Sequence, residues 1–385
     1  MTRKKKIVKL TLAAFIFALA LAQIAYVQST FLNQFFNLGT VSFIFFIAYI
    51  ITFIVMNLYP NIIARFNNLN TAVTVFALEI FSLLIFILTS QPIAIFLAFI
   101  LYVICINILF INFDVFLEAH TSNVKTGRIR GAYFTIYNIG WVISPFISGQ
   151  ILDKLGFNWI FSLVIILTLP IIFILITTFK DFKNSYDHQR FSVKKTLKEL
   201  LGQPDLKKIF YLAFLLQVFY ATMVIYTPIY LNQTIGLVWD QIGIIFSIML
   251  LPFILIQYPA GYIADKYLGE KELLTTGLII TAIASILIFY TNTTNILIWA
   301  LILFFSRIGA SLIEIMRDSY FFKKVDVEDL SLINSFRSTM PLAYIFTPLI
   351  MGWVLHFWPI HYIFLILSLI MLTGLYSAIT FKDTK

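Results

Sequence analysis

Long apolar stretches separated by short polar breaks run along nearly the whole chain. An α-helix rises about 1.5 Å per residue, so about 20 apolar residues suffice to cross a hydrocarbon core about 30 Å thick. The pattern therefore predicts an all-α integral membrane protein with twelve transmembrane helices. Their expected positions are residues 7–28, 36–58, 71–89, 92–117, 131–152, 158–179, 208–231, 240–264, 272–290, 295–317, 333–355 and 360–381.

The basic residues fall in alternate breaks between these helices. If the amino terminus is cytoplasmic, Lys154 is the only one of the 27 Lys and Arg residues in a loop that faces outward. Cations concentrate in the cytoplasmic loops of membrane proteins, so the pattern predicts that both termini are cytoplasmic. The long polar stretch 180–207 then forms a cytoplasmic linker between an N-terminal six-helix bundle, residues 1–179, and a C-terminal one, residues 208–385.

The composition excludes a soluble fold. Of the 385 residues, 61% are hydrophobic and 12% are charged, whereas soluble domains carry about 25% charged residues. The mean hydropathy is +0.94. The formal charge of +9 follows the loops, and no basic, aromatic-interleaved segment accompanies it, so the lipid bilayer is an expected partner and nucleic acid is not. Frequent Phe, Ile, Asn and Lys point to an AT-rich microbial genome and a bacterial inner membrane.

No residue pattern typical of catalysis or of a cofactor site is found. Cys105 is the single cysteine and lies in an apolar run, so neither a disulfide framework nor a thiolate metal cluster can form within one chain. The four histidines lack ligand spacing, and there is no phosphate-binding loop. We therefore expect no enzyme activity, no metal and no cofactor. The basic and apolar start could be a cleaved signal peptide, but the repeat described next requires the first helix.

The chain contains an internal repeat. The LNQ sequence at residues 32–34 recurs at residues 231–233, and Tyr59-Pro60 matches Tyr258-Pro259 at the same offset of 199 residues. The segment SPFISGQILDKLGFNWIF from Ser144 aligns with TPLIMGWVLHFWPIHYIF from Thr347 at an offset of 203 residues. Six helices per unit give both halves the same orientation, as in parallel repeats that can rock about a central site.

The segment GYIADKYLGEK after the eighth predicted helix resembles the loop signature of the major facilitator superfamily. Small residues let helices approach closely, a carboxylate near a helix end can bind a cationic partner, and glycine permits a tight turn. The resemblance implies a gating latch at this loop. The first half has PNIIARFNNLN at the corresponding position, so its signature is degenerate. The signature residues are Gly261, Asp265, Gly269 and Lys271.

The fifth predicted helix resembles the antiporter signature of the same superfamily, with serine at two usual glycine positions. Small residues allow close helix packing, and proline bends a helix. Together the two motifs, the repeat and the topology imply two six-helix bundles around a central cavity that work by alternating access. The antiporter-like residues are Gly131, Gly140, Ser144, Pro145, Ser148 and Gly149.

Ionisable residues lie near the middle of two predicted helices. Glu79 in the third helix is a candidate proton carrier, because an ionised carboxylate is costly inside the membrane; a neutral structural Glu is the alternative. Arg307 in the tenth helix cannot lose its proton and needs a carboxylate, water or an anionic ligand. The tenth helix of the family lines the cavity, so Arg307 is a candidate for substrate binding or coupling, against a structural ion pair. Glu314 lies about 10.5 Å further along the helix, too far for a direct pair.

Further polar residues are candidates for a cytoplasmic gate and for the cavity. Charges at the inner ends of the fourth and tenth helices are expected to form a network, with solvated helix ends as the alternative. By the family pattern Arg317 is the expected partner of Asp265. The gate candidates are Asp114, Glu118, Arg130, Arg317 and Asp318. The cavity candidates, which could equally hold helices together, are Gln23, Asn107, Asn112, Gln217, Tyr220 and Tyr226.

The expected function is secondary active transport of a small-molecule substrate by a monomer, with protons as the coupling ion. The first hypothesis is export of an amphipathic compound, which rests on the fifth-helix pattern, the aromatic-rich composition and a buried carboxylate. One alternative is an importer of a sugar, nucleoside or organic anion. An alternative of another class is a membrane receptor or assembly partner that does not transport.

Overall fold

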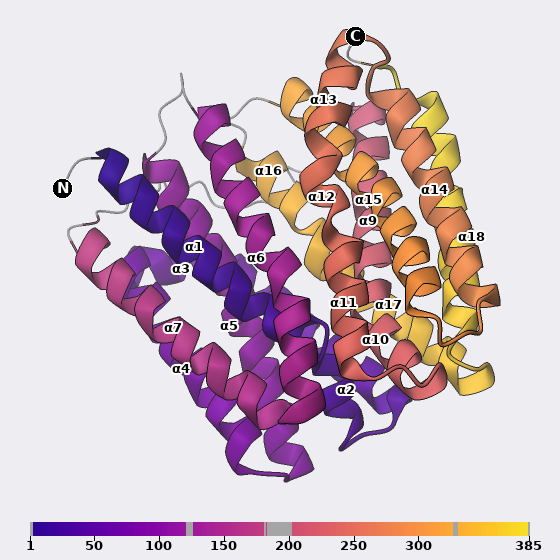
Figure 1. Cartoon of the computed structure of the whole chain (residues 1–385). Helices are drawn as coiled ribbons and strands as arrows, with labels where there is room; N and C mark the ends of the chain where they lie inside the picture. The colour runs from indigo at the N-terminus through magenta and orange to yellow at the C-terminus, as the bar shows by residue number, and fades with distance from the viewer. Residues whose placement is uncertain (1–2, 121–125, 181, 183–201, 326–329, 384–385) are drawn as a thin grey trace. The chain divides into compact units, whose positions relative to one another are not determined.

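The computed structural model describes all of the chain except residues 1–2, 121–125, 181, 183–201, 326–329 and 384–385 (Figure 1). The described residues form helices and contain no β-strand. The elements are α1 (Arg3–Ala25), α2 (Gln28–Asn33), α3 (Leu38–Phe66), α4 (Asn68–Leu88), α5 (Pro92–His120), α6 (Thr126–Lys154), α7 (Phe157–Phe179), α9 (Pro204–Ile225), α10 (Thr227–Ile229), η1 (Tyr230–Thr234), α11 (Trp239–Leu250), α12 (Pro252–Leu255), α13 (Gln257–Lys266), α14 (Glu270–Tyr290), α15 (Ile296–Lys324), α16 (Leu330–Arg337), α17 (Thr339–Phe357) and α18 (Tyr362–Thr380).

The described helices account for the expected spans. Eleven of them, counting consecutive short helices as one span, are long and apolar enough to cross a membrane by length and composition. The twelfth expected span is α6, which is 29 residues long but contains more Gly, Ser and other polar residues than the others. The prediction of an all-helical, multi-pass membrane protein is therefore confirmed.

Several helices extend beyond the apolar stretches that predict them. α3 ends at Phe66 rather than near residue 58, and α15 ends at Lys324 rather than near residue 317. The helices continue because the basic residues in their last turns can reach the polar interface while the backbone stays hydrogen-bonded. α9 begins at Pro204, inside the expected linker, since proline is favoured in the first helical turn. Most of that linker, residues 181 and 183–201, lies outside the described residues.

Two spans contain interruptions. The eighth span consists of α11, α12 and α13, and α12 begins at Pro252, whose missing N–H cannot bond to the preceding turn. The seventh span continues from α9 through α10, with Pro228 in its first turn, into the single π-helical turn η1. Interruptions of this kind bend a helix at a defined residue.

The chain divides into two compact units. The first comprises Met1–Asn37, Ile47–His188 and Val238–Gly243. In it α1 packs against α6 and α7, and α4 packs against α5 and α7. Aromatic rings fill its centre, where the Phe17 centroid lies 4.9 Å from that of Phe113. The core of this unit therefore contains a cluster of aromatic rings among many aliphatic side chains.

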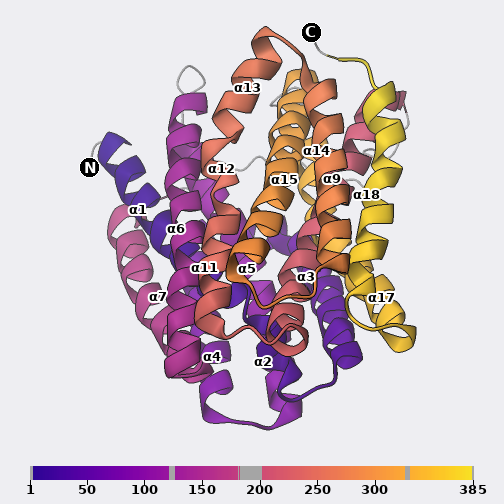
Figure 2. The same cartoon turned by 45° about the vertical axis from the view of Figure 1, so that its right-hand side comes forward.

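The second unit comprises Leu38–Phe46, Gln189–Leu237 and Ile244–Lys385. α14 packs against both α15 and α18, while α9 packs against α15, α17 and α18. Figure 2 shows α9, α14, α15 and α18 running side by side. This arrangement brings the charged residues of α15 next to α9.

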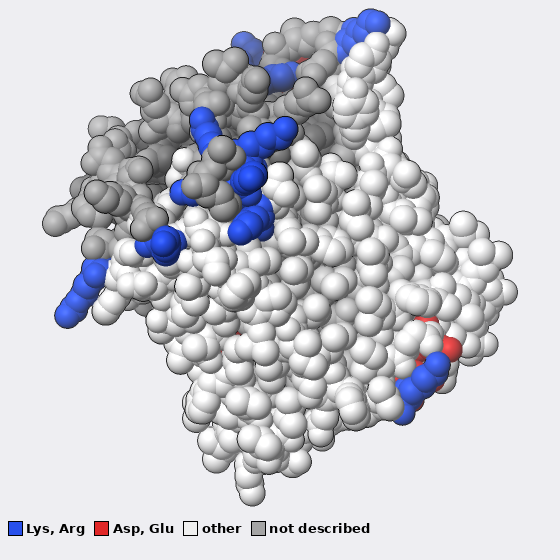
Figure 3. Space-filling view, turned by 60° about the vertical axis from the view of Figure 1, so that its left-hand side comes forward, with Lys and Arg blue, Asp and Glu red and all other residues white. Residues whose placement is uncertain are grey.

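The surface suits a bilayer. Many large apolar side chains are exposed on helices of both units, for example Leu88 at 78% and Phe173 at 68%. Figure 3 shows one face on which a broad area carries no charged side chain, while most of the Lys and Arg side chains lie toward the top and left of the view and a further basic side chain lies beside acidic ones at the lower right. A soluble protein rarely exposes so large an apolar area, whereas lipid tails cover one without cost.

Candidate functional site

The charged residues of α15 form the centre of the candidate site in the second unit. The N-terminus of α15 is capped by Asn295, whose side chain accepts hydrogen bonds from the backbone N–H groups of Leu297 and Ile298. Four of the predicted residues follow along this helix: Arg307, Glu314, Arg317 and Asp318. α15 therefore carries one basic residue, Arg307, near its middle and both acidic and basic residues toward its C-terminal end.

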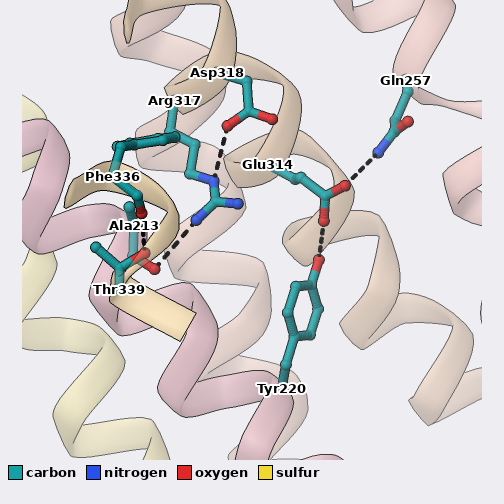
Figure 4. Close-up of polar contacts among 8 residues, drawn as sticks. All are labelled: Ala213, Tyr220, Gln257, Glu314, Arg317, Asp318, Phe336 and Thr339. Atoms are coloured by element: carbon teal, nitrogen blue, oxygen red, sulfur yellow. Dashed lines mark hydrogen bonds and ion pairs between the residues drawn. The ribbon is translucent and has the colours of Figure 1, made fainter. Parts of the chain in front are cut away.

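Glu314 is held by two neutral side chains from neighbouring helices. The Tyr220 hydroxyl on α9 donates to Glu314 Oε2 at 2.5 Å, and Gln257 Nε2 on α13 donates to Glu314 Oε1 at 3.3 Å (Figure 4). Hydrogen bonds to an ionised carboxylate are stronger than bonds between neutral groups. Glu314 therefore joins α15 to α9 and α13.

Arg307 is buried among aromatic rings. Its exposed fraction is 1%, and its guanidinium carbon lies 5.1 Å from the ring centroid of Phe219 and 5.6 Å from that of Tyr220. Cation–π attraction of this kind is stronger in a site without water. Among the described residues, however, the Nε and Nη1 atoms have no hydrogen-bond partner. Rings stabilise the charge of Arg307 but leave two of its nitrogen atoms free to donate.

Arg317 connects α15 to two further elements. Its Nε lies 3.2 Å from Asp318 Oδ1, its Nη1 donates to the Ala213 carbonyl of α9 at 3.3 Å, and its guanidinium carbon lies 5.3 Å from the Phe336 ring of α16. Figure 4 shows the side chain reaching between these groups. The expected partner, Asp265, has a side chain outside the described residues, so that pair stays a prediction.

The other signature residues lie on α13, directly before α14 and in the first turn of α14. Gly269 has a φ of 107° and a ψ of 177°, which only glycine adopts readily. It precedes α14 directly, and the backbone N–H groups of Glu270 and Lys271 donate to the carboxylate of Asp383 at 3.0 and 3.4 Å. By contrast, a Cβ on Gly261 would meet no atom of the described residues within 4 Å, apart from the surrounding backbone of its own helix. The loop signature thus contains one glycine that its conformation requires and one in open space.

In the first unit, Glu79 of α4 is buried with an exposed fraction of 2%. Its Oε2 has no hydrogen-bond partner among the described residues, and its electrostatic neighbours on α5 are Tyr102 and Cys105. An ionised carboxylate in such a place would cost several kcal/mol unless paired. The site therefore favours the neutral acid.

Two of the other polar candidates of the first unit bond to the backbone of their own helix. Asn107 donates to the Val103 carbonyl at 2.8 Å, and Asn112 donates to the Ile108 carbonyl at 3.0 Å. Gln23 is fully buried, and neither of its amide atoms has a partner among the described residues. Asp114 is half-buried at the end of α5. The side chains of Glu118 and Arg130 lie outside the described residues.

The antiporter-like residues of α6 bring this helix close to its neighbours. A Cβ on Gly140 would stand 2.9 Å from that of Ala18, and Ser144 Oγ donates to the Leu19 carbonyl at 2.8 Å. Further along, Ser148 Oγ bonds to the Pro145 carbonyl. Gly149 lies against Gly243 so closely that a Cβ would collide with the backbone there. Gly131, at the start, is exposed in open space.

The remaining cavity candidates lie on α9. Tyr226 is fully buried and shares a hydrogen bond of 2.8 Å with Ser42. Gln217 is half-buried. The sequence reasoning missed Gln257, Phe219 and Asp383. Gln257 was detectable as a polar residue in an apolar stretch, whereas one of 41 phenylalanines carries no such signal.

The helices and the exposed apolar surface define a polytopic membrane protein. The family model for the Major Facilitator Superfamily matches residues 10–240 and again residues 239–385. The chain therefore belongs to the major facilitator superfamily. The expected family membership and the expected fold of two repeats are confirmed. It is a transporter of a small-molecule substrate and not an enzyme. No curated protein sequence matches it significantly.

Solved transporter structures share the fold. A bacterial homologue of the iron transporter ferroportin in its inward-facing state matches with a TM-score of 0.73, 14% identity and 99% coverage of both chains. A mutant of the nucleoside transporter NupG gives 0.78 and 11% identity over 98% of this chain and 100% of the other. An auto-inhibited peptide transporter of the POT family gives 0.78 and 11% over 99% and 98%. At such identities the likeness shows the fold alone.

Proposed function

We propose that transport by this protein is coupled to protons and that Glu314 is the group that gains and loses the proton. The observation that carries the proposal is the pair of hydrogen bonds that Tyr220 and Gln257 donate to the Glu314 carboxylate. Both donors are neutral, and the described residues give Glu314 no ion-pair partner. Glu314 is also only partly buried. It can therefore take up a proton without breaking an ion pair.

Protonation changes what Glu314 can bind. An ionised carboxylate only accepts hydrogen bonds, whereas a protonated carboxyl also donates one. The neutral form therefore holds Tyr220 and Gln257 less tightly. Because these contacts join α15 to α9 and α13, a proton alters how three helices are held together. A proton that binds one arrangement better than another shifts the protein toward it, as coupling requires.

Export of an amphipathic compound is the direction that we favour. The close packing of α6 on α1 at Gly140 and Ser144 supports the comparison with the antiporter signature. A cationic amphipathic compound would compete with the proton for Glu314, which makes the two bind in exchange. The aromatic rings of Phe219 and Tyr220 next to the site suit the apolar part of such a compound.

Purified protein in liposomes that contain the pH-sensitive dye pyranine tests the proposal. Ethidium, a lipophilic cation, should drive proton movement through the wild-type protein and not through Glu314→Gln, because Gln cannot titrate. Glu272→Gln removes an exposed carboxylate from α14 and should behave as the wild type does. Ethidium flux that ignores an imposed pH gradient would overturn proton coupling.

Arg307 favours a second candidate function, the uptake of an organic anion. Its two nitrogen atoms without partners could bind a carboxylate. Arg307→Gln should then abolish binding of benzoate to the detergent-purified protein, measured by calorimetry, while the melting temperature stays near that of the wild type. Unchanged benzoate binding would exclude a role of Arg307 in binding an organic anion.

Two other hypotheses can be tested by measuring flux. One is an importer of a sugar or nucleoside; the other is a receptor or assembly partner that does not transport, which flux of any solute would exclude.

The charge pattern supports a proposal for orientation and location. The distribution of Lys and Arg over alternate loops favours cytoplasmic termini, and the composition favours a bacterial inner membrane. We expect a monomer to be the transporting unit. Protease accessibility of both ends in inside-out vesicles, and light scattering of the detergent complex, test these expectations.

A further inference from the structure

Two residues of α15 carry opposite charges and have no ion-pair partner among the described residues. Arg307 is 1% exposed, and its Nε and Nη1 atoms donate to no described atom. Glu314 is half-buried and is held by the neutral side chains of Tyr220 and Gln257. An unpaired charge that is removed from water costs free energy. Both residues can therefore gain from a partner that the described part of the chain does not supply.

The helix arrangement does not itself require a charge at position 307. α5 and α15 are the fourth spans of the two repeated halves, and each packs against the span before it, α4 and α14 respectively. The repeat offsets of 199 and 203 place Arg307 opposite residues 104–108, whose sequence ICINI contains no charged residue. α5 is helical over this stretch without an arginine. A ligand therefore explains the Arg307 charge better than helix packing does.

Aromatic rings lie beside both charges. The guanidinium carbon of Arg307 lies 5.1 Å from the ring centroid of Phe219 and 5.6 Å from that of Tyr220. The hydroxyl of the same Tyr220 ring points to Glu314, as Figure 4 shows. The Tyr220 centroid also lies 6.1 Å from that of Phe253 on α12. An apolar group placed between the two charges would therefore lie against aromatic side chains.

We infer that the substrate of this site is an amphipathic zwitterion. Its anionic group binds Arg307, its cationic group binds Glu314, and its apolar body lies against Phe219 and Tyr220. The inference rests on the proposed function, since it takes Glu314 as the group that exchanges a proton for substrate, and it names the class of that substrate. A zwitterion pairs with both charges of α15 at once, whereas a simple cation or a simple anion leaves one of them unpaired.

Neither end of the zwitterion needs to break a hydrogen bond of the site. A guanidinium offers five N–H donors, and those on Nε and Nη1 of Arg307 have no described acceptor, so a carboxylate or phosphate can bind there. A carboxylate offers about four acceptor positions, and Tyr220 and Gln257 use two of them at Glu314. An ammonium group can therefore bind Glu314 while both neutral donors stay in place.

Three small compounds separate the two charges experimentally. 4-(Aminomethyl)benzoate carries a carboxylate and an ammonium at opposite ends of one aromatic ring, whereas benzoate and benzylamine each carry one of the two groups. Calorimetry on the full-length protein in detergent, near neutral pH and without a pH gradient, measures the three affinities. The zwitterion should bind the wild type about tenfold or more tightly than benzoate or benzylamine, because only the zwitterion forms both ion pairs.

Two variants should each remove one half of this preference. Arg307→Gln should lower the affinity for 4-(aminomethyl)benzoate to that for benzylamine and leave benzylamine binding unchanged. Glu314→Gln should lower it to that for benzoate and leave benzoate binding unchanged. Arg307→Lys keeps a cation and should retain part of the preference, which distinguishes lost charge from lost folding. The matched controls, Lys154→Gln and Glu272→Gln, remove exposed charges elsewhere and should bind all three compounds as the wild type does.

Three results would overturn the inference. The wild type could bind the zwitterion no more tightly than the better of benzoate and benzylamine, or it could bind none of the three compounds. Arg307→Gln or Glu314→Gln could also leave the affinity for the zwitterion unchanged. These outcomes differ from a failure of proton coupling, because the pyranine assay measures proton movement driven by ethidium. Loss of that movement would remove the proposed function and leave the measured preference for a zwitterion in place.

Discussion

Tyr220 donates its phenolic hydrogen to Glu314 at 2.5 Å, and the same ring lies 5.6 Å from the guanidinium carbon of Arg307. One aromatic side chain of α9 therefore contacts both the acid and the base of α15. Arg307 and Glu314 are seven residues apart, about 10.5 Å along the helix axis. The two groups can influence one another without a direct ion pair, because the Tyr220 side chain contacts both of them.

Removing the Tyr220 hydroxyl should weaken the proton response while keeping the aromatic ring. Tyr220→Phe deletes the donor to Glu314 but retains the face against Arg307. A hydrogen bond to an ionised group contributes about 1.5–3 kcal/mol, so the free energy of unfolding should fall by that amount at a pH where Glu314 is ionised. The pH at which ethidium-driven proton flux is half-maximal should also move.

The matched control is Tyr211→Phe on the same helix. Tyr211 is exposed, and its hydroxyl shares a hydrogen bond of 2.5 Å with Thr373. Removal of the Tyr211 hydroxyl should leave the pH profile of ethidium-driven proton flux unchanged. If Tyr220→Phe and Tyr211→Phe give the same profile as the wild type, Tyr220 does not take part in coupling.

Replacing Arg307 should separate a structural role from a functional one. Burying a charge without an ion pair costs free energy, and an apolar residue of similar length removes that cost. Arg307→Met should therefore melt at the same temperature as the wild type or higher, while benzoate binding, if present in the wild type, is lost. A lower melting temperature, measured by scanning calorimetry, would instead show that the rings stabilise Arg307 enough to make it part of the core.

The spans were predictable from the sequence, and the site was predictable only in part. Apolar runs determine spans because any backbone group in lipid must bond within its own helix. Arg307 and Glu314 stand out for the same reason, since charged residues are rare in such runs. Their partners do not stand out. Phe219 resembles every other phenylalanine, and Asp383 reaches Glu270 across 113 residues of sequence, a pairing that no local pattern encodes.

The neutral state of Glu79 gives a prediction for the first unit. Gln has the shape of a protonated Glu, so Glu79→Gln should change the free energy of unfolding by less than about 1 kcal/mol and leave ethidium-driven proton flux intact. Glu79→Lys would place a permanent charge among Tyr102 and Cys105 and should unfold the protein or prevent its insertion. Loss of proton flux in Glu79→Gln would move the proton carrier from Glu314 to Glu79.

The two glycines of the loop signature should respond differently to the same substitution. Gly269→Ala puts a Cβ on a residue with a φ of 107°, where it also collides with the Asp383 carboxylate. Backbone conformations of this kind cost about 1–3 kcal/mol for other residues, so the melting temperature should fall and the amides of Glu270 and Lys271 should exchange faster. Gly261→Ala adds the same methyl group within a helix and in open space, where alanine is favoured over glycine by about 1 kcal/mol. It should be neutral or stabilising. Equal melting temperatures for the two variants would mean that the start of α14 does not depend on the glycine at position 269.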